Sequence, residues 1–385
     1  MPRRAVFSLF FLAVFLQAGA YGLTFMLPDL FAGFGGDEKD VGAMLFITAC
    51  ATLLSVYYAG HLSDLFGRIA TLSIGCLLIA AALVLYAAAS SVGVVLVFAS
   101  ILLGAGWAQT YALAPVVMTR LVEPADRVRF FALLSVCVMA GFGLSPVMTA
   151  KMLANGFGVR DAFFVTGGLA AISAALFAIL IRPIRAQSLG AGAEARARLT
   201  RDAVIRIFRS KAGLPVTMIL LGASVFAGMT NFQTVFAAER GVDYALYFAV
   251  YTGVVVTFRL VLAGFSGGPN PYLTIAILLC SMGASPLVFI FMGNSTALYV
   301  LVAILFGLGY GVAYPVLVAM AANDADPGLV PQTLQLFALT YFVGIFGFPL
   351  IAGWMIVEVG TTPLLWLVAC FAFVEAGMAL RGALR

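Results

Sequence analysis

The sequence predicts an all-α polytopic membrane protein with twelve transmembrane helices, arranged as two similar six-helix halves. Of its 385 residues, 63% are hydrophobic and only 10% are charged, whereas a soluble domain carries about 25% charged residues. The mean hydropathy is +1.11, and apolar stretches of about 20 residues, long enough to cross a bilayer, recur along the whole chain. The polar helix faces that a soluble helical bundle needs are absent from the sequence.

Breaks that are polar, charged, or rich in Gly and Pro separate the apolar stretches. The first stretch, residues 5–30, is too long for a signal-peptide core and lacks a clear small-residue cleavage site, so it is predicted to be a transmembrane helix. The twelve predicted spans are 6–30, 41–60, 69–89, 92–120, 129–151, 161–182, 213–238, 244–263, 272–292, 296–321, 332–357 and 362–381.

The distribution of Lys and Arg predicts the orientation, because cytoplasmic loops carry the excess of positive charge. An even number of spans places both termini on one side of the membrane. If that side is the cytoplasm, it holds sixteen of the 21 Lys and Arg residues, and the opposite side holds four: Lys39, Lys151, Arg160 and Arg240. We therefore expect cytoplasmic termini and a monomeric, multi-pass protein of the bacterial inner membrane.

The domain organisation follows from the same pattern. Residues 1–183 and 213–385 are predicted to form the two six-helix bundles, and 184–212 a basic cytoplasmic linker. The linker either only joins the halves and enforces topology, or it also contacts lipid or regulates the protein. The +5 net charge is explained by topology and does not indicate nucleic-acid binding. All five cysteines lie in apolar stretches, so we expect no disulfide, metal site or cofactor.

Glycine, proline and tyrosine residues repeat at a constant distance of 203 positions. Such a constant offset indicates a duplicated six-helix unit in parallel orientation, an architecture in which the solute site lies between the repeats near mid-membrane. The glycines and Pro146–Pro349 are predicted helix-packing or hinge positions. The pairs are Gly104–Gly307, Gly106–Gly309, Tyr111–Tyr314, Pro124–Pro327, Gly141–Gly344 and Pro146–Pro349.

The turn between the second and third spans contains Gly60, Asp64, Gly67 and Arg68. An anion at this junction can bond a helix N-terminus or an arginine, and the glycines permit a tight turn. The spacing resembles the signature loop of the major facilitator superfamily. With Leu27–Pro28 at the end of the first span and Gly141 to Pro146 in the fifth, the chain resembles most the exporter-like permeases of that superfamily. The resemblance implies rocker-switch alternating access.

The resemblance further implies that this cluster latches the halves together in the outward-facing state. Arg120 and Arg127 are its candidate partners. The second half carries Gly267 at the position equivalent to Asp64, so the latch is expected on one side only. A purely topological turn is the alternative. The fourth span lacks the arginine that many members carry before the Gly-rich run, so the proton-coupling role of that arginine does not transfer.

Polar side chains inside spans usually face a protein interior or a wet cavity, since exposure to lipid is costly. In the resembling family, spans 1, 4, 7 and 10 line the solute cavity. Contact with solute and interhelical hydrogen bonding both remain open for each residue. The predicted cavity residues in these spans are Gln17, Tyr21, Thr24, Trp107, Tyr111, Gln233, Tyr310 and Tyr314.

Arg259 completes the predicted cavity set and is the only cation well inside a span. It resembles the eighth-span arginine of monocarboxylate and oxalate-type carriers, which suits an organic anion because a guanidinium binds a carboxylate with two parallel hydrogen bonds. Two alternatives stay open. The side chain could extend to the cytoplasmic interface, or it could pair with Glu375 in the last span.

The predicted function is secondary transport of a small organic solute. The solute moves either alone or coupled to a proton or a counter-substrate. An organic anion is one solute class. Efflux of drugs, amphiphiles or sugars is the alternative, favoured by the aromatic pairs and the 33 phenylalanines, and a non-transporting sensor on the same fold is a third. With one histidine in the chain and no phosphate-binding loop, the sequence indicates neither an enzyme nor an ATP-driven pump.

Overall fold

The computed structural model describes residues 2–123, 126–187, 199–263, 265 and 267–384. Within these residues the chain is helical, and twelve helices are long and apolar enough to cross a membrane. This confirms the predicted fold class. Part of the predicted linker, 188–198, lies outside the described residues.

The first half supplies six spans, of which the first is interrupted by a 3₁₀ turn. Its elements are α1 (Arg3–Gly22), η1 (Leu23–Met26) and α2 (Leu27–Ala32), then α3 (Glu38–Phe66), α4 (Arg68–Ala88), α5 (Val94–Leu121), α6 (Arg127–Ala154) and α7 (Val159–Gln187).

The second half repeats this order after the short helix α8 (Arg201–Arg209). A break at Phe232 divides its first span, and a π-helical stretch divides its fifth. Its elements are α9 (Gly213–Asn231), α10 (Gln233–Arg240), α11 (Tyr244–Val261), α12 (Pro271–Phe291), α13 (Thr296–Asn323), α14 (Val330–Phe342), η3 (Val343–Gly347), α15 (Phe348–Glu358) and α16 (Thr361–Ala383).

Two helices run clearly beyond their predicted spans. The second predicted span ends at residue 60, but α3 continues to Phe66, and α7 reaches Gln187 instead of 182. Hydropathy marks the part of a helix that is apolar, whereas backbone hydrogen bonding continues into the polar layer outside it. At its other end α3 begins with a capping box, in which the Asp37 carboxylate accepts from the backbone of Lys39 and Asp40 at 2.9 and 3.1 Å.

Equivalent glycines of the two halves make equivalent helix contacts. A Cβ at Gly104 of α5 would lie 3.0 Å from the backbone nitrogen of Thr52 on α3, and a Cβ at Gly307 of α13 would lie 3.2 Å from the Tyr251 carbonyl on α11. In both halves, therefore, the second and fourth spans pack closely at equivalent positions, as the repeat predicts.

Two further glycine pairs give the same result. Gly106 and Gly309 pack α5 on α4 and α13 on α12, respectively. Gly141 of α6 packs against α1, where an added Cβ would lie 2.7 Å from the Gly19 nitrogen. Gly344 of η3 packs against α9, where an added Cβ would lie 2.6 Å from the Leu220 carbonyl. The duplicated glycines are thus sites of close helix approach in both halves.

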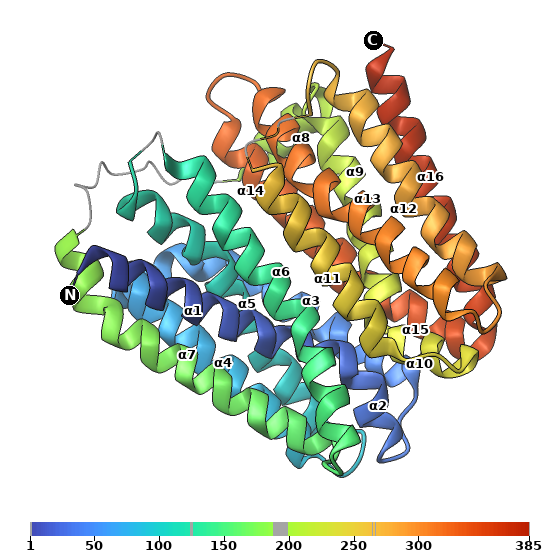
Figure 1. The fold of residues 1–385 in the computed structure, drawn as a ribbon. Coiled ribbons are helices and arrows are strands. Elements are labelled where there is room, and N and C mark those ends of the chain that lie inside the picture. Colours follow the sequence, from blue (N-terminus) through green and yellow to red (C-terminus); the bar gives the residue numbers. More distant parts are fainter. Residues whose placement is uncertain (1, 124–125, 188–198, 264, 266, 385) are drawn as a thin grey trace.

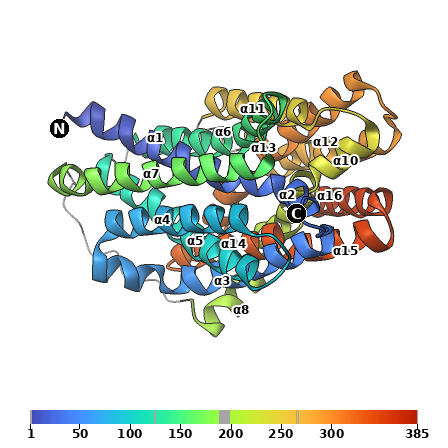
Figure 2. The same ribbon diagram turned by 90° about the horizontal axis from the view of Figure 1, so that it is seen from below.

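The two halves meet along two helix pairs, α6 with α11 and α3 with α15. Figure 1 shows them converging at the end that carries α2, α10 and α15 and diverging toward the end that carries both chain termini and α8. Seen from below, the helices of the first half occupy the left of the bundle, and α12, α15 and α16 the right (Figure 2). We call these ends the far end and the termini end.

Backbone contact and an ion pair close the far end. Cβ atoms added at Gly42 and Gly353 would collide with the opposite helix, the first 3.0 Å from the Leu350 Cα and the second 2.8 Å from the Glu38 carbonyl carbon. Lys39 of α3 forms an ion pair with Glu358 of α15. At the termini end, by contrast, the α3 side chains Leu54 and Tyr57 are 65% and 77% exposed. The structure therefore represents a form whose far end is closed, and Figure 1 shows the two halves diverging toward the termini end.

The described part of the linker contains α8. Thr200 caps it by accepting a hydrogen bond from the Ala203 nitrogen at 3.2 Å. Ile207 is buried, and Arg206 lies 3.5 Å from Asp326 in the turn after α13. This segment therefore docks on the second half through one apolar and one charged contact.

Candidate functional site

An aromatic cluster fills the interface between the halves, about midway along the spans. From the first half, Tyr21 stacks on Trp107 with ring centroids 4.1 Å apart, and Trp107 lies 5.9 Å from Tyr111. From the second half, Tyr310 lies 6.1 Å from Tyr314. The hydroxyl groups of Tyr111 and Tyr314 are 2.6 Å apart and share a hydrogen bond. Two residues related by the 203-residue repeat thus join the halves across the interface.

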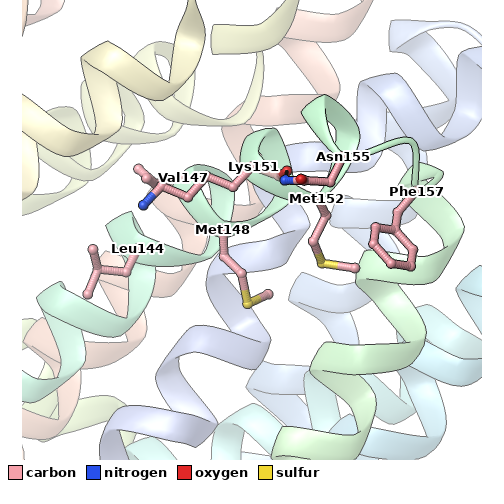
Figure 3. A pocket seen from close by; sticks show the side chains of 7 residues that line it. All are labelled: Leu144, Val147, Met148, Lys151, Met152, Asn155 and Phe157. Carbon is pink, nitrogen blue, oxygen red and sulfur yellow. Dashed lines mark hydrogen bonds between the residues drawn. The ribbon is translucent and has the colours of Figure 1, made fainter.

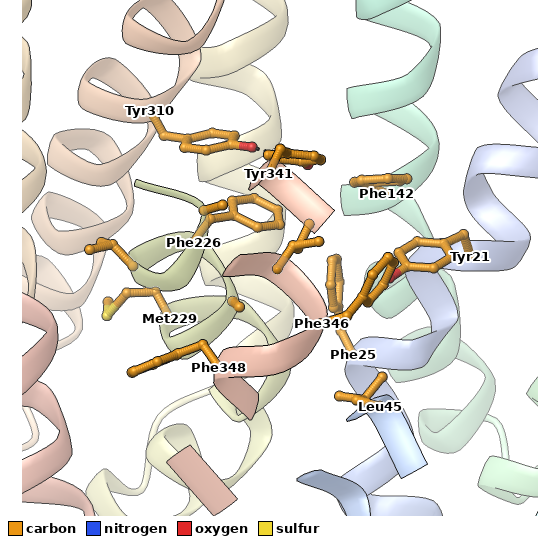
Figure 4. Packing of buried hydrophobic residues seen from close by; sticks show 14 of the residues in the cluster. Tyr21, Phe25, Leu45, Phe142, Phe226, Met229, Tyr310, Tyr341, Phe346 and Phe348 are labelled. Carbon is orange, nitrogen blue, oxygen red and sulfur yellow. Dashed lines mark hydrogen bonds between the residues drawn. The ribbon is translucent and has the colours of Figure 1, made fainter. Parts of the chain in front are cut away.

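Further aromatic residues extend the cluster into the second half. Tyr310 stacks on Phe226 with ring centroids 4.4 Å apart, and its hydroxyl lies 3.4 Å from that of Tyr341. Phe346 meets Tyr21 edge to face at 5.7 Å. Figure 4 shows Tyr310 and Tyr341 pointing toward each other, with Phe346 between them and Tyr21. Five predicted cavity residues therefore lie together, and they are packed against one another.

Three predicted cavity residues lie outside this cluster. Gln17 donates to the Thr110 hydroxyl at 2.8 Å and so links α1 to α5. Gln233 donates to the Tyr299 hydroxyl at 2.7 Å and links α10 to α13. The third, Thr24, is fully buried in η1. For Gln17 and Gln233, the structure matches the alternative of interhelical hydrogen bonding within one half.

Arg259 of α11 lies at the interface between the halves and is only 7% exposed. Its Nε donates to the Gly311 carbonyl at 3.1 Å, and one terminal nitrogen donates to the Ser135 hydroxyl on α6 of the other half. The guanidinium interacts electrostatically with the hydroxyl groups of four tyrosines, namely Tyr111, Tyr310 and Tyr314 of the aromatic cluster and Tyr251 of α11. Its other terminal nitrogen, Nη2, has no hydrogen-bond partner among the described residues.

The alternatives to solute contact for Arg259 do not match this geometry. The side chain is buried between α6, α11 and α13 and does not extend to an interface with water. In the described part of the chain it forms no ion pair, and the Glu375 carboxylate has no hydrogen-bond donor. The hypothesis that Arg259 pairs with Glu375 is therefore wrong for the described form, because Arg259 donates to Gly311 and Ser135 and the Glu375 carboxylate accepts from no described residue.

Sequence reasoning missed several members of the site. Ser135 and Gly311 hold the guanidinium, and Tyr341 and Phe346 complete the aromatic cluster. The positions 203 residues away from Ser135 and Tyr341 are Ala338 and Val138, so the repeat gives no signal for them. The polarity of Ser135 inside the fifth span was the only available clue.

The predicted latch lies at the termini end. α3 ends at Phe66, Gly67 follows with φ of 87°, and α4 starts at Arg68. Left-handed backbone of this kind favours glycine. Asp64 is exposed, and Arg127 donates to the Thr119 carbonyl at 3.4 Å. Gly60 lies in the last turns of α3, and Arg120 in the last turn of α5.

A groove of about 500 Å³ on α6 is separate from the aromatic cluster (Figure 3). Apart from Lys151 and Asn155, its walls are apolar. Its lining comes only from α6 and the turn that follows, and it includes none of the predicted solute-contacting residues: Leu144, Val147, Met148, Lys151, Met152, Asn155 and Phe157.

Twelve membrane-spanning helices in two equivalent halves, with polar and aromatic side chains gathered between them, define a secondary transporter built from parallel repeats. The chain belongs to the Major Facilitator Superfamily, whose family model matches residues 9–349. The resemblance seen at residues 60–68 is thus confirmed. No curated protein matches the sequence.

Solved structures share the fold at low sequence identity. A transporter of the POT family in complex with a thioalcohol-conjugated peptide superposes with a TM-score of 0.76 at 16% identity, over 98% of this chain and 96% of that one. A mutant of the nucleoside transporter NupG superposes with a TM-score of 0.75 at 15% sequence identity, over 98% of this chain and 99% of that one. The human organic anion transporter MFSD10 (TETRAN) superposes with a TM-score of 0.68 at 15% sequence identity, over 98% of this chain and 100% of that one.

Proposed function

We propose that this secondary transporter carries a small organic anion, bound between the halves by Arg259. One observation carries the proposal: a buried guanidinium at the inter-half interface forms no ion pair among the described residues and has one terminal nitrogen without a partner. A charge inside a membrane span is costly and normally has a counter-charge or a functional role. A solute carboxylate would supply both the charge and the missing acceptor.

The chemistry of arginine narrows the solute class. A guanidinium presents its donors in a planar fork that matches the two oxygens of a carboxylate. Nη2 offers one such donor, and Nη1 could release Ser135 to offer a second. The tyrosine hydroxyls near the guanidinium can accept or donate further hydrogen bonds. The supported solute is therefore a carboxylate with an apolar or aromatic body that fits among the rings.

The proposed transport cycle follows the rocker-switch scheme. Residues 1–183 and 213–385 move as two bodies joined by 184–212. With the termini in the cytoplasm, the form described here is inward-facing, closed at the far end by α3 and α15. The Tyr111–Tyr314 hydrogen bond closes the centre. Entry of a solute from the cytoplasm requires these two hydroxyls to separate, and they are then free to bind it.

The direct test of the proposed function is uptake by proteoliposomes that contain the purified protein. Radiolabelled aliphatic and aromatic monocarboxylates and dicarboxylates are offered, with cationic amphiphiles and neutral sugars as competitors. We expect saturable uptake of at least one carboxylate and competition by other carboxylates only. Transport of amphiphiles but of no carboxylate would favour the efflux alternative, which the aromatic cluster supports.

The proposed orientation predicts the pattern of cysteine labelling in a cysteine-free background. A cysteine at Asn294, in the exposed turn before α13, should react with an impermeant maleimide added outside intact cells. A cysteine at Arg201, exposed at the start of α8, should react only after permeabilisation. Labelling of the Arg201 position in intact cells would reverse the orientation and make the described form outward-facing.

The proposed latch predicts the effect of Asp64→Asn. The latch acts in the outward-facing state, where the termini end is closed, and a neutral amide weakens charge-assisted hydrogen bonds worth about 1.5–3 kcal/mol. The variant should therefore populate the inward-facing form more and transport more slowly. Distances between spin labels on the two halves at the termini end measure the shift, with Asp126→Asn as a control. Unchanged distances and transport would reduce residues 60–68 to a topological turn.

A further inference from the structure

Glu375 is a buried acid that the proposed solute site does not use. It lies in α16, is 0% exposed, and neither of its carboxylate oxygens has a hydrogen-bond partner among the described residues. Moving an ionised carboxylate out of water without a counter-charge costs far more than protonating it. In this form of the protein the side chain is therefore a neutral carboxylic acid.

Among the described residues, no charged side chain near the carboxyl group could replace the proton. Both oxygens lie 3.0 Å from the place that a Cβ on Gly222 of α9 would occupy, and α9 itself carries no titratable residue. Tyr310 and Tyr314 of α13 line a small cavity together with Glu375. Of the remaining titratable side chains on the packed helices, Cys280 and Cys370 are exposed. Tyr272 is bonded to Asp324, Tyr299 to Gln233, and Glu358 to Lys39. Arg381 lies in the last turn of α16.

A small cavity lies between this acid and two tyrosines of the central aromatic cluster. It measures about 10 Å³, and its lining includes Glu375, Gly222, Tyr310 and Tyr314. A volume of that size holds about one water molecule. Tyr314 is the residue that closes the interface by its hydrogen bond to Tyr111. A water in the cavity would thus lie between the acid and the hydroxyl groups that a solute must separate.

We propose that Glu375 is a proton-binding site, occupied in the described form and reached from the centre through this cavity. On loading, a proton from water bonds to one carboxylate oxygen, and the neutral group packs against Gly222. On release, that O–H bond breaks, the proton returns to water, and the carboxylate needs hydration that the present packing excludes. Because α9 packs against α16 and also against α14 and η3 of the central interface, ionisation disfavours the described form.

The test measures conformation against pH without any solute, so its failure is distinct from failure of the anion proposal. Spin labels replace Leu65 of α3 and Asn323 of α13 at the termini end in a cysteine-free protein, and the distance distribution is followed from acid to alkaline pH. The native protein should shift from the described form to a second form as pH rises. Glu375→Gln, which mimics the protonated acid, should remain in the described form throughout.

Two results would overturn the proposal: a native protein whose distances do not depend on pH, or a Glu375→Gln variant that keeps the full dependence. If Glu375→Gln does not fold, Gly222→Ala takes its place, because its methyl group reaches the carboxyl oxygens. It should shift the pH of the transition, whereas Gly377→Ala, whose Cβ meets nothing within 4 Å, should not. An identical transition in both alanine variants would also contradict the proposal.

Discussion

Replacing Arg259 with glutamine should raise the KM for carboxylate uptake roughly 10- to 100-fold. A hydrogen bond to a charged group is worth about 1.5–3 kcal/mol, and each 1.4 kcal/mol is about a factor of ten in affinity. Arg259→Lys should lose much of the same affinity although it keeps the charge, because an ammonium cannot reproduce the two parallel hydrogen bonds of the guanidinium. Initial uptake rates in proteoliposomes give KM and the maximal rate for each variant.

The controls separate solute binding from a structural role of Arg259. Arg182→Gln removes an exposed cation at the end of α7 and should leave KM unchanged. The double variant Arg259→Gln, Glu375→Gln should transport no better than Arg259→Gln alone, because the two side chains do not pair. Recovery in the double variant would restore the pairing hypothesis that the structure rejects. Native carboxylate uptake by Arg259→Gln would end the anion proposal.

The second large effect is expected at the far-end contact between α3 and α15. The double variant Gly42→Ala, Gly353→Ala adds two methyl groups where the backbones of the two halves touch. Overpacking costs about 1–3 kcal/mol, and here only the form closed at the far end bears that cost. The protein should therefore be trapped open at the far end, with transport reduced about tenfold or more.

Distances between spin labels across the far end measure this opening. Gly347→Ala is the matched control, since an added Cβ there meets nothing within 4 Å, and it should behave like the native protein. If the double variant transports normally and keeps the native distances, α3 and α15 do not form the seal. A loss of folded protein would be visible as a lower Tm, which a cycling defect alone does not require.

The fold was predictable because its two main signals are local or periodic. Hydropathy locates lipid-facing helices wherever they occur, and the duplicated glycines mark close helix contacts in both halves, as at Gly106 and Gly309. The ends of α3 and α7 were not predicted, because helices continue after their apolar stretches stop. The π-helical stretch Val343–Gly347 carries Phe346 into the aromatic cluster, whereas the equivalent positions 140–144 lie in the regular helix α6.

The site was predictable only where symmetry or unusual polarity marked it. Tyr111 and Tyr314 were found through the repeat, and Arg259 through its charge inside a span. Ser135 lies 124 residues from Arg259, and their contact arises only when the two halves dock. Pairing with Arg259 was one of the alternatives that the sequence left open for Glu375, because the position of a residue along a span does not give the face on which its side chain lies.

Thermal stabilisation of the purified protein by candidate solutes tests the central claim most directly. A ligand that binds only the native state at 100 times its Kd stabilises that state by about 2.7 kcal/mol. A panel of carboxylates, cationic amphiphiles and sugars is applied to the native protein, Arg259→Gln and Arg182→Gln. We predict that one or more carboxylates raise the Tm of the native protein and of Arg182→Gln but not that of Arg259→Gln. Stabilisation by amphiphiles alone, equal in all three proteins, would contradict an anion site at Arg259.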